Sequence, residues 1–296
     1  MSLERFRNYL SLEKQYSAHT AKAYLRDLEQ FQAYCEEVHD NAPLSTLPYA
    51  VIRSWIITLM EAGCSNRTVN RKIASLKAYY RYLLQKGEIA ASPLASHRPL
   101  KTERALEVPF SEKEMQELLS RWEGDGGFEA IRDRLVVELL YTTGIRRAEL
   151  IGIRMADLDV EAGTLKVLGK RNKERILPLL DPIRPLLLSY LQARAAAFPE
   201  TESTFFFLSG SGNKLYESLV YRIINKYLSE VSEKAKKSPH ILRHTFATHM
   251  LSRGADMNSV KELLGHASLA STQVYTHNSI AELKRIHLES HPRNEE

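Results

Sequence analysis

The chain has 296 residues, of which 44% are hydrophobic and 26% charged, a composition typical of a globular protein of about two domains. Its apolar runs are shorter than the ~18 residues of a membrane span, and residues 1–14 lack the apolar core of a signal peptide. Cys35 and Cys64 match no metal-binding or redox spacing, so we expect two reduced thiols in a cytoplasmic protein. The net charge of +5 permits a polyanionic partner, and residues 1–100 hold most of the excess, with 13 Lys and Arg against 9 Asp and Glu.

The first 90 residues are expected to form a bundle of four or five helices. Gly87 ends the last of them, and three prolines with little periodicity follow. Residues 91–107 are therefore a predicted linker between domains 1–90 and 108–296. The segments with apolar residues at helical spacing are 3–10, 20–36, 51–60 and 66–85.

The second predicted domain, residues 108–296, is expected to be mainly helical around a short antiparallel meander. Ser111 and Glu114 have the spacing of a capping box at the start of a helix. From residue 158 to 180, three strand-like segments are separated by turns at 161–163 and 169–173. The predicted fold class is therefore mainly α, with a helical N-terminal bundle and a mixed α/β domain that contains a small antiparallel sheet.

A basic segment covers residues 66–86, where no acidic residue occurs and Tyr79, Tyr80 and Tyr82 are interleaved with the cations. A basic helix with an apolar reverse face can lie across phosphates or enter a major groove. We favour this interpretation over a merely solvated helix face. The candidate nucleic-acid contacts of the segment are Arg67, Arg71, Lys72, Lys77 and Arg81.

Two arginines, Arg146 and Arg147, follow a glycine turn and open a predicted helix. Backbone N–H groups and guanidinium groups at such a place suit an oxyanion. A structural pair between Arg146 and Glu149 is an equally good interpretation. Lys170 lies at the tip of a cationic hairpin, whose spacing and following residues do not match a nucleotide-binding loop.

The densest group of histidines lies between residues 238 and 278. His240 and Arg243 share a helix face and can point at one phosphate. His240 and His244 have the spacing of a zinc pair, but no glutamate lies between them as in a zinc protease, so we expect no metal site. We expect His244 and His249 to cap or fill the fold.

The candidate residues together match the needs of metal-free phosphoryl transfer, although spacing alone does not show that they meet. The reaction needs positive charge on the equatorial oxygens, an activated nucleophile and a proton for the leaving oxygen. A phosphotyrosine link would keep the energy of the original ester, so no nucleotide would be consumed. The candidates are Arg146, Arg243 and His266 for the charge, Tyr275 for the nucleophile, and Lys170 and His240 for the proton transfers.

In chain order these motifs resemble the signature of the tyrosine recombinase (phage integrase) family, and of its Xer-type members in particular. The resemblance spans the chain, because residues 1–90 are similar to the family's core-binding domain and residues 108–296 to its catalytic domain. The matching motifs are Thr143-Gly144-Ile145-Arg146, Gly169-Lys170, His240-x-x-Arg243-His244, Leu264-Gly265-His266 and Tyr275-Thr276-His277.

The resemblance implies that Tyr275 joins to the 3′-phosphate of DNA and frees a 5′-hydroxyl. Two positions depart from the family's pattern, Ile241 in place of aspartate and Arg171 in place of glycine. Arg171 and Lys173 of the hairpin are candidate DNA contacts. The other implied roles are phosphate binding by Arg146, Arg243 and His266, general acid chemistry by Lys170, general base chemistry by His240 and support of the site by Glu149.

The implied substrate is double-stranded DNA, with no metal, no cofactor and no membrane partner. Four protomers, identical or paralogous, would assemble on two sites, and an accessory activator could license the reaction. Residues 280–286 would dock on a neighbouring protomer or else pack in cis. We expect no additional arm-binding domain, which favours the resolution of chromosome or plasmid dimers. The alternatives are a mobile-element integrase or invertase, a type IB topoisomerase-like enzyme and a catalytically idle DNA-binding protein.

Overall fold

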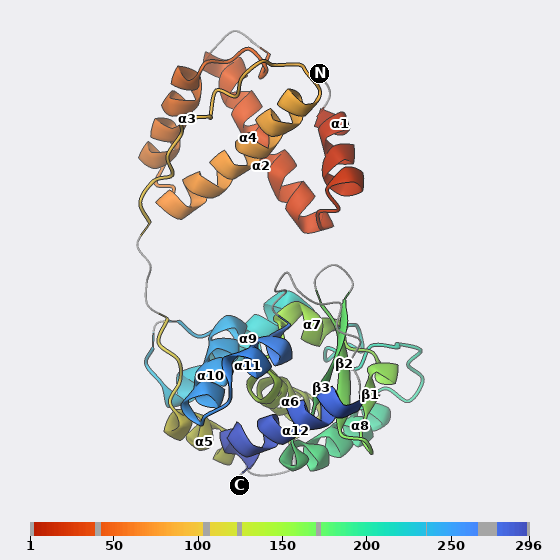
Figure 1. Cartoon of the computed structure of the whole chain (residues 1–296). Coiled ribbons are helices and arrows are strands. Elements are labelled where there is room, and N and C mark those ends of the chain that lie inside the picture. Colours follow the sequence, from red (N-terminus) through yellow and green to blue (C-terminus); the bar gives the residue numbers. More distant parts are fainter. Residues whose placement is uncertain are drawn as a thin grey trace. The chain divides into compact units, whose positions relative to one another are not determined.

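The chain forms two compact units in a computed structural model (Figure 1), an N-terminal unit of residues 1–105 and a C-terminal unit of residues 106–296. The structure describes residues 3–38, 43–102, 107–122, 126–169, 173–234, 236–265 and 277–294. No helix within these ranges is long and apolar enough to cross a membrane.

Helices make up the N-terminal unit, as the apolar periodicity predicts. The first predicted helix divides into α1 and a π-helical segment, η1. The last helix begins where the sequence indicates, because the Ser65 hydroxyl caps it by accepting a hydrogen bond from the Thr68 amide at 3.3 Å. The elements are α1 (Leu3–Asn8), η1 (Tyr9–Glu13), α2 (Ala18–Val38), α3 (Tyr49–Glu61) and α4 (Asn66–Gln85).

The core of the N-terminal unit includes the apolar reverse face of α4. Tyr79, Tyr80 and Tyr82, which are interleaved with cations in the sequence, are all buried. The Phe6 ring of α1 contacts Tyr79 edge-on, with ring centroids 5.2 Å apart. Burying such a ring stabilises the fold by about 1.5–3 kcal/mol, so these tyrosines serve the core rather than the surface.

The C-terminal unit contains a small sheet surrounded by helices. The predicted capping box at its start is present, with the Ser111 amide donating to Glu114 Oε2 at 2.7 Å and the Glu114 amide to Ser111 Oγ at 3.2 Å. The helices and strands are α5 (Glu112–Ser120), α6 (Phe128–Thr143), α7 (Arg147–Gly152), η2 (Met155–Asp157), β1 (Leu158–Asp159), β2 (Thr164–Leu168), β3 (Glu174–Pro178), η4 (Asp181–Ile183), α8 (Arg184–Ala197), α9 (Glu217–Val231), α10 (Pro239–Ser252), α11 (Met257–Leu264), α12 (His277–Ser290) and η5 (Pro292–Asn294).

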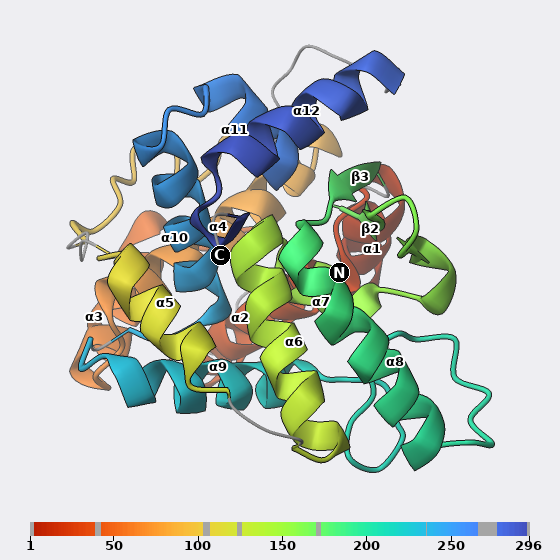
Figure 2. The same ribbon diagram turned by 90° about the horizontal axis from the view of Figure 1, so that it is seen from below.

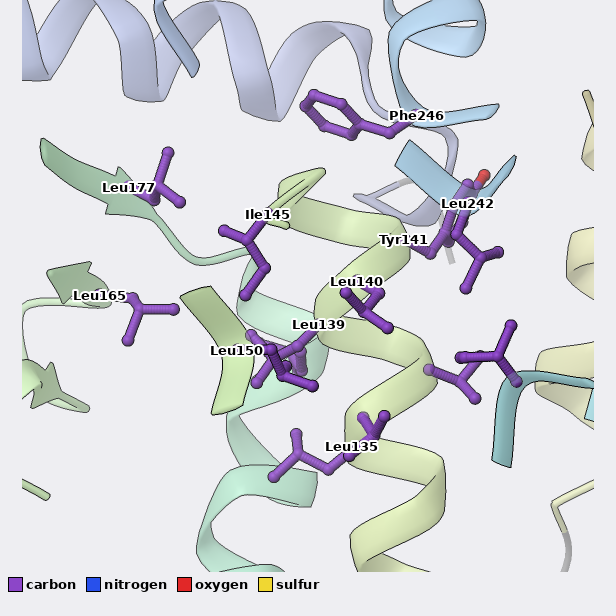
Figure 3. Close-up of a cluster of buried hydrophobic side chains, with 14 of the residues drawn as sticks. Leu135, Leu139, Leu140, Tyr141, Ile145, Leu150, Leu165, Leu177, Leu242 and Phe246 are labelled. Atoms are coloured by element: carbon purple, nitrogen blue, oxygen red, sulfur yellow. The ribbon is translucent and has the colours of Figure 1, made fainter. Parts of the chain in front are cut away.

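The central helix of this unit is α6, which packs against α8, α9 and α10 (Figure 2). Every side chain from residue 135 to 143 is buried. Figure 3 shows Leu135 and Leu140 of this helix within a cluster that also includes Leu165 and Leu177 of the sheet and Phe246 of α10. A helix buried on nearly all sides provides a rigid support, and the candidate site is built around its C-terminal end.

The three-stranded sheet confirms the predicted antiparallel meander. Its order is β1-β2-β3, and the register pairs Leu165 with Leu177 and Val167 with Arg175. Leu165, Val167, Leu177 and Arg175 are all buried. Because alternate residues of a strand face one side, Arg175 occupies a position in β3 where the alternation would favour an apolar residue.

The C-terminal helix α12 packs in cis, against β3, α10 and α11 of its own chain. Leu283 is buried in the core of the unit, and His287 Nε2 bonds the Thr142 carbonyl at 2.7 Å. The helix thus contributes Leu283 and His287 to the core of its own unit.

Candidate active site

The turn between α6 and α7 places Arg146 at the N-cap of α7. Gly144 ends α6 in the left-handed conformation, with φ of +60°. The Arg146 amide donates to Glu149 Oε2 and the Arg146 Nη1 donates to Glu149 Oε1, both at 2.8 Å. The structural pair considered for these two residues therefore exists. The Arg146 side chain remains 35% exposed, so pairing does not remove it from the surface.

Glu149 is buried and binds a second arginine, Arg175 of β3. Arg175 donates from Nη1 to Glu149 Oε1 at 3.0 Å and from Nη2 to Oε2 at 2.8 Å. Burial alone would raise the pKa of Glu149, but the bonds from Arg175 and Arg146 outweigh it and hold the pKa below its usual value. The carboxylate is therefore ionised at neutral pH, and one negative charge lies between two positive ones.

Arg243 of α10 is fixed by the carbonyl groups at the ends of two other helices. Its Nη1 donates to the Gly144 carbonyl at 2.6 Å, and its Nη2 donates to the Leu264 carbonyl at 2.7 Å. Gly144 and Leu264 lie at the C-terminal ends of α6 and α11, where unpaired carbonyl groups carry partial negative charge. Burial and the neighbouring Arg146 lower the pKa of Arg243 to about 10, which leaves it charged at neutral pH.

Two glycines permit this close packing. Gly144 and Gly265 both have positive φ, +60° and +63°, a region that favours glycine. A Cβ at Gly144 would lie 2.5 Å from the Phe246 ring, and one at Gly265 would lie 3.0 Å from Arg175 Nη1. The Arg146 Nη2 also donates to the Gly265 carbonyl at 3.4 Å. The C-terminal ends of α6 and α11 thus converge on the arginines.

The histidines of α10 differ in exposure. His240 is exposed in the first turn of the helix, one turn before the buried Arg243. His249 fills the fold as expected, with Nδ1 bonded to the Tyr141 hydroxyl at 3.0 Å. His244 is exposed instead, so the expectation that it fills the fold is wrong. Position 244 lies on the face of α10 away from the core, one residue past Arg243.

Four predicted site residues, Lys170, Arg171, His266 and Tyr275, lie outside the described residues. The residues that precede Lys170 and His266 are described, and both of them, Gly169 and Gly265, lie close to the Arg175 guanidinium. Gly169 closes the β2–β3 hairpin, its amide donating to the Lys173 carbonyl at 2.8 Å. Lys173 itself is exposed.

One residue of the candidate site, Arg175, was not predicted from the sequence. Arg175 is buried, and it links Glu149 to the Leu263 carbonyl, which its Nε reaches at 3.0 Å. In the sequence it is one of several cations in a hairpin. The sequence could have indicated this role through a charged residue at a strand position that faces the core. Ile176 and Leu177 follow Arg175 in the strand, and Val167 lies opposite it.

The cations of α4 separate into an exposed and a buried set. Arg67, Arg71 and Arg81 are exposed. Lys72 is buried, and its ammonium lies 3.5 Å from the buried Asp27 carboxylate. We therefore correct the prediction that Lys72 contacts DNA, because its side chain is buried and its ammonium already faces a buried carboxylate.

Arg71 and Lys77 also have partners within the unit. Arg71 pairs with Asp27 while its side chain is 48% exposed. The Lys77 ammonium donates to the His97 carbonyl at 3.1 Å and is partly buried. Across the described residues, no group of three His, Cys, Asp or Glu side chains could hold a metal ion.

Comparison with known proteins follows the two units. The model of the phage integrase family matches residues 109–282, and that of the N-terminal SAM-like domain of phage integrases matches residues 3–87. The chain therefore belongs to the phage integrase family and is a tyrosine-type site-specific DNA recombinase. Within that family it is similar to the XerC proteins. It is 39% identical to the tyrosine recombinase XerC of Chlorobaculum parvum, over 98% of this chain and 94% of the relative.

Solved structures share the fold at lower identity. The XerH site-specific recombinase bound to palindromic difH substrate, a post-cleavage complex, is 20% identical with a TM-score of 0.71, covering 98% of this chain and 81% of that one. A lambda integrase tetramer bound to a Holliday junction is 18% identical with a TM-score of 0.64, covering 93% of this chain and 78% of that one.

Proposed function

We propose that this recombinase resolves chromosome or plasmid dimers by cutting and rejoining DNA through a covalent link between Tyr275 and a 3′-phosphate. The observation that carries the proposal is the anchored arginine pair. Arg146 is held by Glu149, and Arg243 is held by two helix ends, so neither has to reorganise when it meets a phosphate. Preorganised positive charge of this kind stabilises the charge that develops on a transferring phosphoryl group.

In the cleavage step, the Tyr275 hydroxyl oxygen attacks the scissile phosphorus. The bond from phosphorus to the tyrosine oxygen forms as the bond to the 5′-oxygen breaks. His240 takes the phenol proton and Lys170 gives a proton to the departing 5′-oxygen. Arg146, Arg243 and His266 bind the phosphate oxygens throughout. The exposure of His240, one helical turn from Arg243, supports its access to DNA.

Rejoining reverses these steps with a 5′-hydroxyl from another strand. One phosphoester replaces another, so the ester energy is retained and no nucleotide is required. The chain's own arginines, lysine and histidines would supply the charge and the protons, and the proposed mechanism contains no step that needs a metal ion or cofactor.

The exposed face of α4 is the proposed DNA contact of the N-terminal unit. Arg67, Arg71 and Arg81 are exposed at spacings of four and ten residues, which place them along one side of the helix. Ala74 and Ala78 lie between them on that side, and their small side chains would let the helix approach a duplex closely. Lys77 and, in the C-terminal unit, Arg171 and Lys173 complete the set of proposed contacts.

Strand exchange between two duplexes needs more than one active site, so we propose four protomers on two DNA sites. The lambda integrase tetramer on a Holliday junction has the same fold and supports this stoichiometry. The partner protomers would be identical or paralogous, and an accessory protein could activate them. Because the similar XerC proteins are bacterial, the site of action would be the DNA in the cytoplasm.

Covalent trapping tests the reaction and finds the target site together. A pool of labelled, nicked duplexes with randomised sequence is incubated with the protein in EDTA, and adducts are separated on a denaturing gel. We expect a shifted, protease-sensitive band that is lost in Tyr275→Phe. The DNA recovered from the band should converge on one sequence.

Three results would contradict the proposal. Binding without any adduct would indicate an idle DNA-binding protein. An adduct that persists in Tyr275→Phe would assign another nucleophile. Adducts of unselected sequence would favour a topoisomerase-like enzyme over a site-specific recombinase.

A further inference from the structure

We propose that Arg175 is a positioning residue for DNA cleavage, which holds Glu149, and through it Arg146, in the geometry that receives the phosphate. The inference rests on the proposed function and adds to it a residue that would not itself touch DNA. Arg175 is 5% exposed, so it acts on the substrate through its neighbours.

The first observation is the way in which Arg175 uses its donors. Nη1 and Nη2 bind the two oxygens of Glu149, and Nε binds the Leu263 carbonyl near the end of α11. One planar guanidinium thus connects β3, α7 and α11. Lysine has a single charged centre and could not span these three acceptors in the same way.

The second observation is what surrounds the Arg175 guanidinium. A Cβ on Gly169, the residue before Lys170, would lie 3.4 Å from its Nη1. A Cβ on Gly265, the residue before His266, would lie 3.0 Å from the same atom. The backbones that lead to two proposed catalytic residues therefore both pass beside Arg175, and the partner of a third binds it directly.

The consequence for Arg146 follows from the charges. Glu149 Oε1 accepts from both Arg175 and Arg146. With Arg175 present, the buried carboxylate is neutralised from within the protein, and Arg146 keeps a partly exposed guanidinium for an incoming phosphate. Without Arg175, the carboxylate would have Arg146 as its remaining arginine partner and would compete with DNA for it.

The test compares Arg175→Gln, Arg175→Lys and a matched control, Arg194→Gln. Arg194 of α8 is another buried arginine of the same unit, and its Nη2 bonds the carbonyls of Ser203 and Phe205. Its hydrogen bonds do not involve any of the proposed site residues that the structure describes, so its variant measures the effect of losing a buried arginine. The substrate is the nicked duplex recovered by trapping, used with enzyme in excess.

We expect Arg175→Gln to slow adduct formation by about 100-fold, as small misplacements of a reacting group can, while the DNA dissociation constant changes less than about threefold. Arg175→Lys should recover part of the rate because it restores the charge but not the geometry. Arg194→Gln should be less heat-stable but cleave at the wild-type rate. If Arg175→Gln does not fold, the lysine variant carries the test, with an expected loss of about 10-fold.

The pH profile separates positioning from mere stability. Arg175 opposes the effect of burial on the pKa of Glu149. Its loss should raise that pKa, so as the pH is lowered from 7 to 5 more of the variant's Glu149 becomes protonated and stops competing with DNA for Arg146. The ratio of variant to wild-type rate should therefore rise over this range. The same ratio for Arg194→Gln should stay flat.

The outcomes distinguish failure of the proposed function from failure of the positioning role of Arg175. If the wild-type protein forms no adduct, the proposed function fails and the positioning role fails with it. If the wild type cleaves and both Arg175 variants cleave at its rate, the positioning role alone is overturned. A loss of rate in Arg194→Gln equal to that in Arg175→Gln would also overturn it, since general destabilisation would then suffice.

Discussion

Gly144→Ala tests whether the end of α6 is as tightly built as the contacts indicate. Gly144 has a φ of +60°, and its carbonyl accepts a hydrogen bond from Arg243 at 2.6 Å. A Cβ at this position would lie 2.5 Å from Phe246 Cδ1 and 2.8 Å from Leu264 Cδ2. The substitution therefore strains the backbone and overfills the core at one point.

The expected magnitude is the sum of these two effects. Placing alanine in the left-handed region costs about 1–2 kcal/mol, and forcing a carbon into a packed core costs about 1–3 kcal/mol. The free energy of unfolding of the C-terminal unit should fall by about 2–5 kcal/mol in total. Gly254→Ala is the control, because Gly254 has a φ of +90° but a Cβ there would meet nothing within 4 Å. That variant should lose only the backbone part.

Urea unfolding followed by tryptophan fluorescence measures the difference. The chain has two tryptophans, Trp55 in the N-terminal unit and Trp122 in the C-terminal unit. In a Trp55→Phe background, the signal therefore reports the C-terminal unit alone. If Gly144→Ala and Gly254→Ala were equally destabilising, the reasoning about the close approach of Phe246 and Leu264 would be refuted.

Three further predictions concern catalysis, DNA affinity and pH. Arg243→Ala should lower the rate of adduct formation by two to three orders of magnitude, about 3–4 kcal/mol, and weaken binding far less, as measured by trapping and filter binding. Replacing Arg67 and Arg71 by Gln should flatten the slope of log affinity against log salt by about 0.9 for each phosphate that is no longer neutralised. The control Lys72→Met should leave this slope unchanged and lower the stability of the N-terminal unit. Burial lowers the pKa of His287 to about 4, whereas the same group in the unfolded chain has a pKa near 6.5. As the pH falls, the unfolded chain therefore takes up the proton first. The stability that neutral His287 contributes is complete above about pH 6.5 and is lost as the pH falls toward 4, by at most ~1.4 kcal/mol per pH unit. His287→Gln should reduce this dependence of the urea midpoint on pH between 6.5 and 5, and an unchanged dependence would exclude His287 as its source.

Sequence reasoning succeeded where the signal is local. The helix Asn66–Gln85 begins at its serine cap and ends where expected, and the capping box of Ser111 is present. The meander around Gly163 is likewise a local pattern of alternation and turn residues. Such elements could be predicted because the residues that determine them are neighbours in the chain.

The errors and omissions concern the partners of charged side chains. Lys72 has the same charge and the same helix as Arg71, yet it is buried beside Asp27, about 45 residues earlier in the chain. In the sequence, Arg175 is one of several cations of a hairpin, although its side chain binds Glu149 of α7. Neither pairing has a local signature, because the partners come from other elements of the fold.

The sequence by itself determined the family, the helical architecture and the set of residues that could perform phosphoryl transfer, because motif order and periodicity are properties of the chain. Only the tertiary structure decided which charges are exposed, and that the C-terminal ends of α6 and α11 meet at Arg243. It also decided that Arg175 neutralises Glu149 while Arg146 stays partly exposed. The physical reason is that an ion pair depends on distance, burial and available carbonyl groups, which packing sets between residues far apart in the chain.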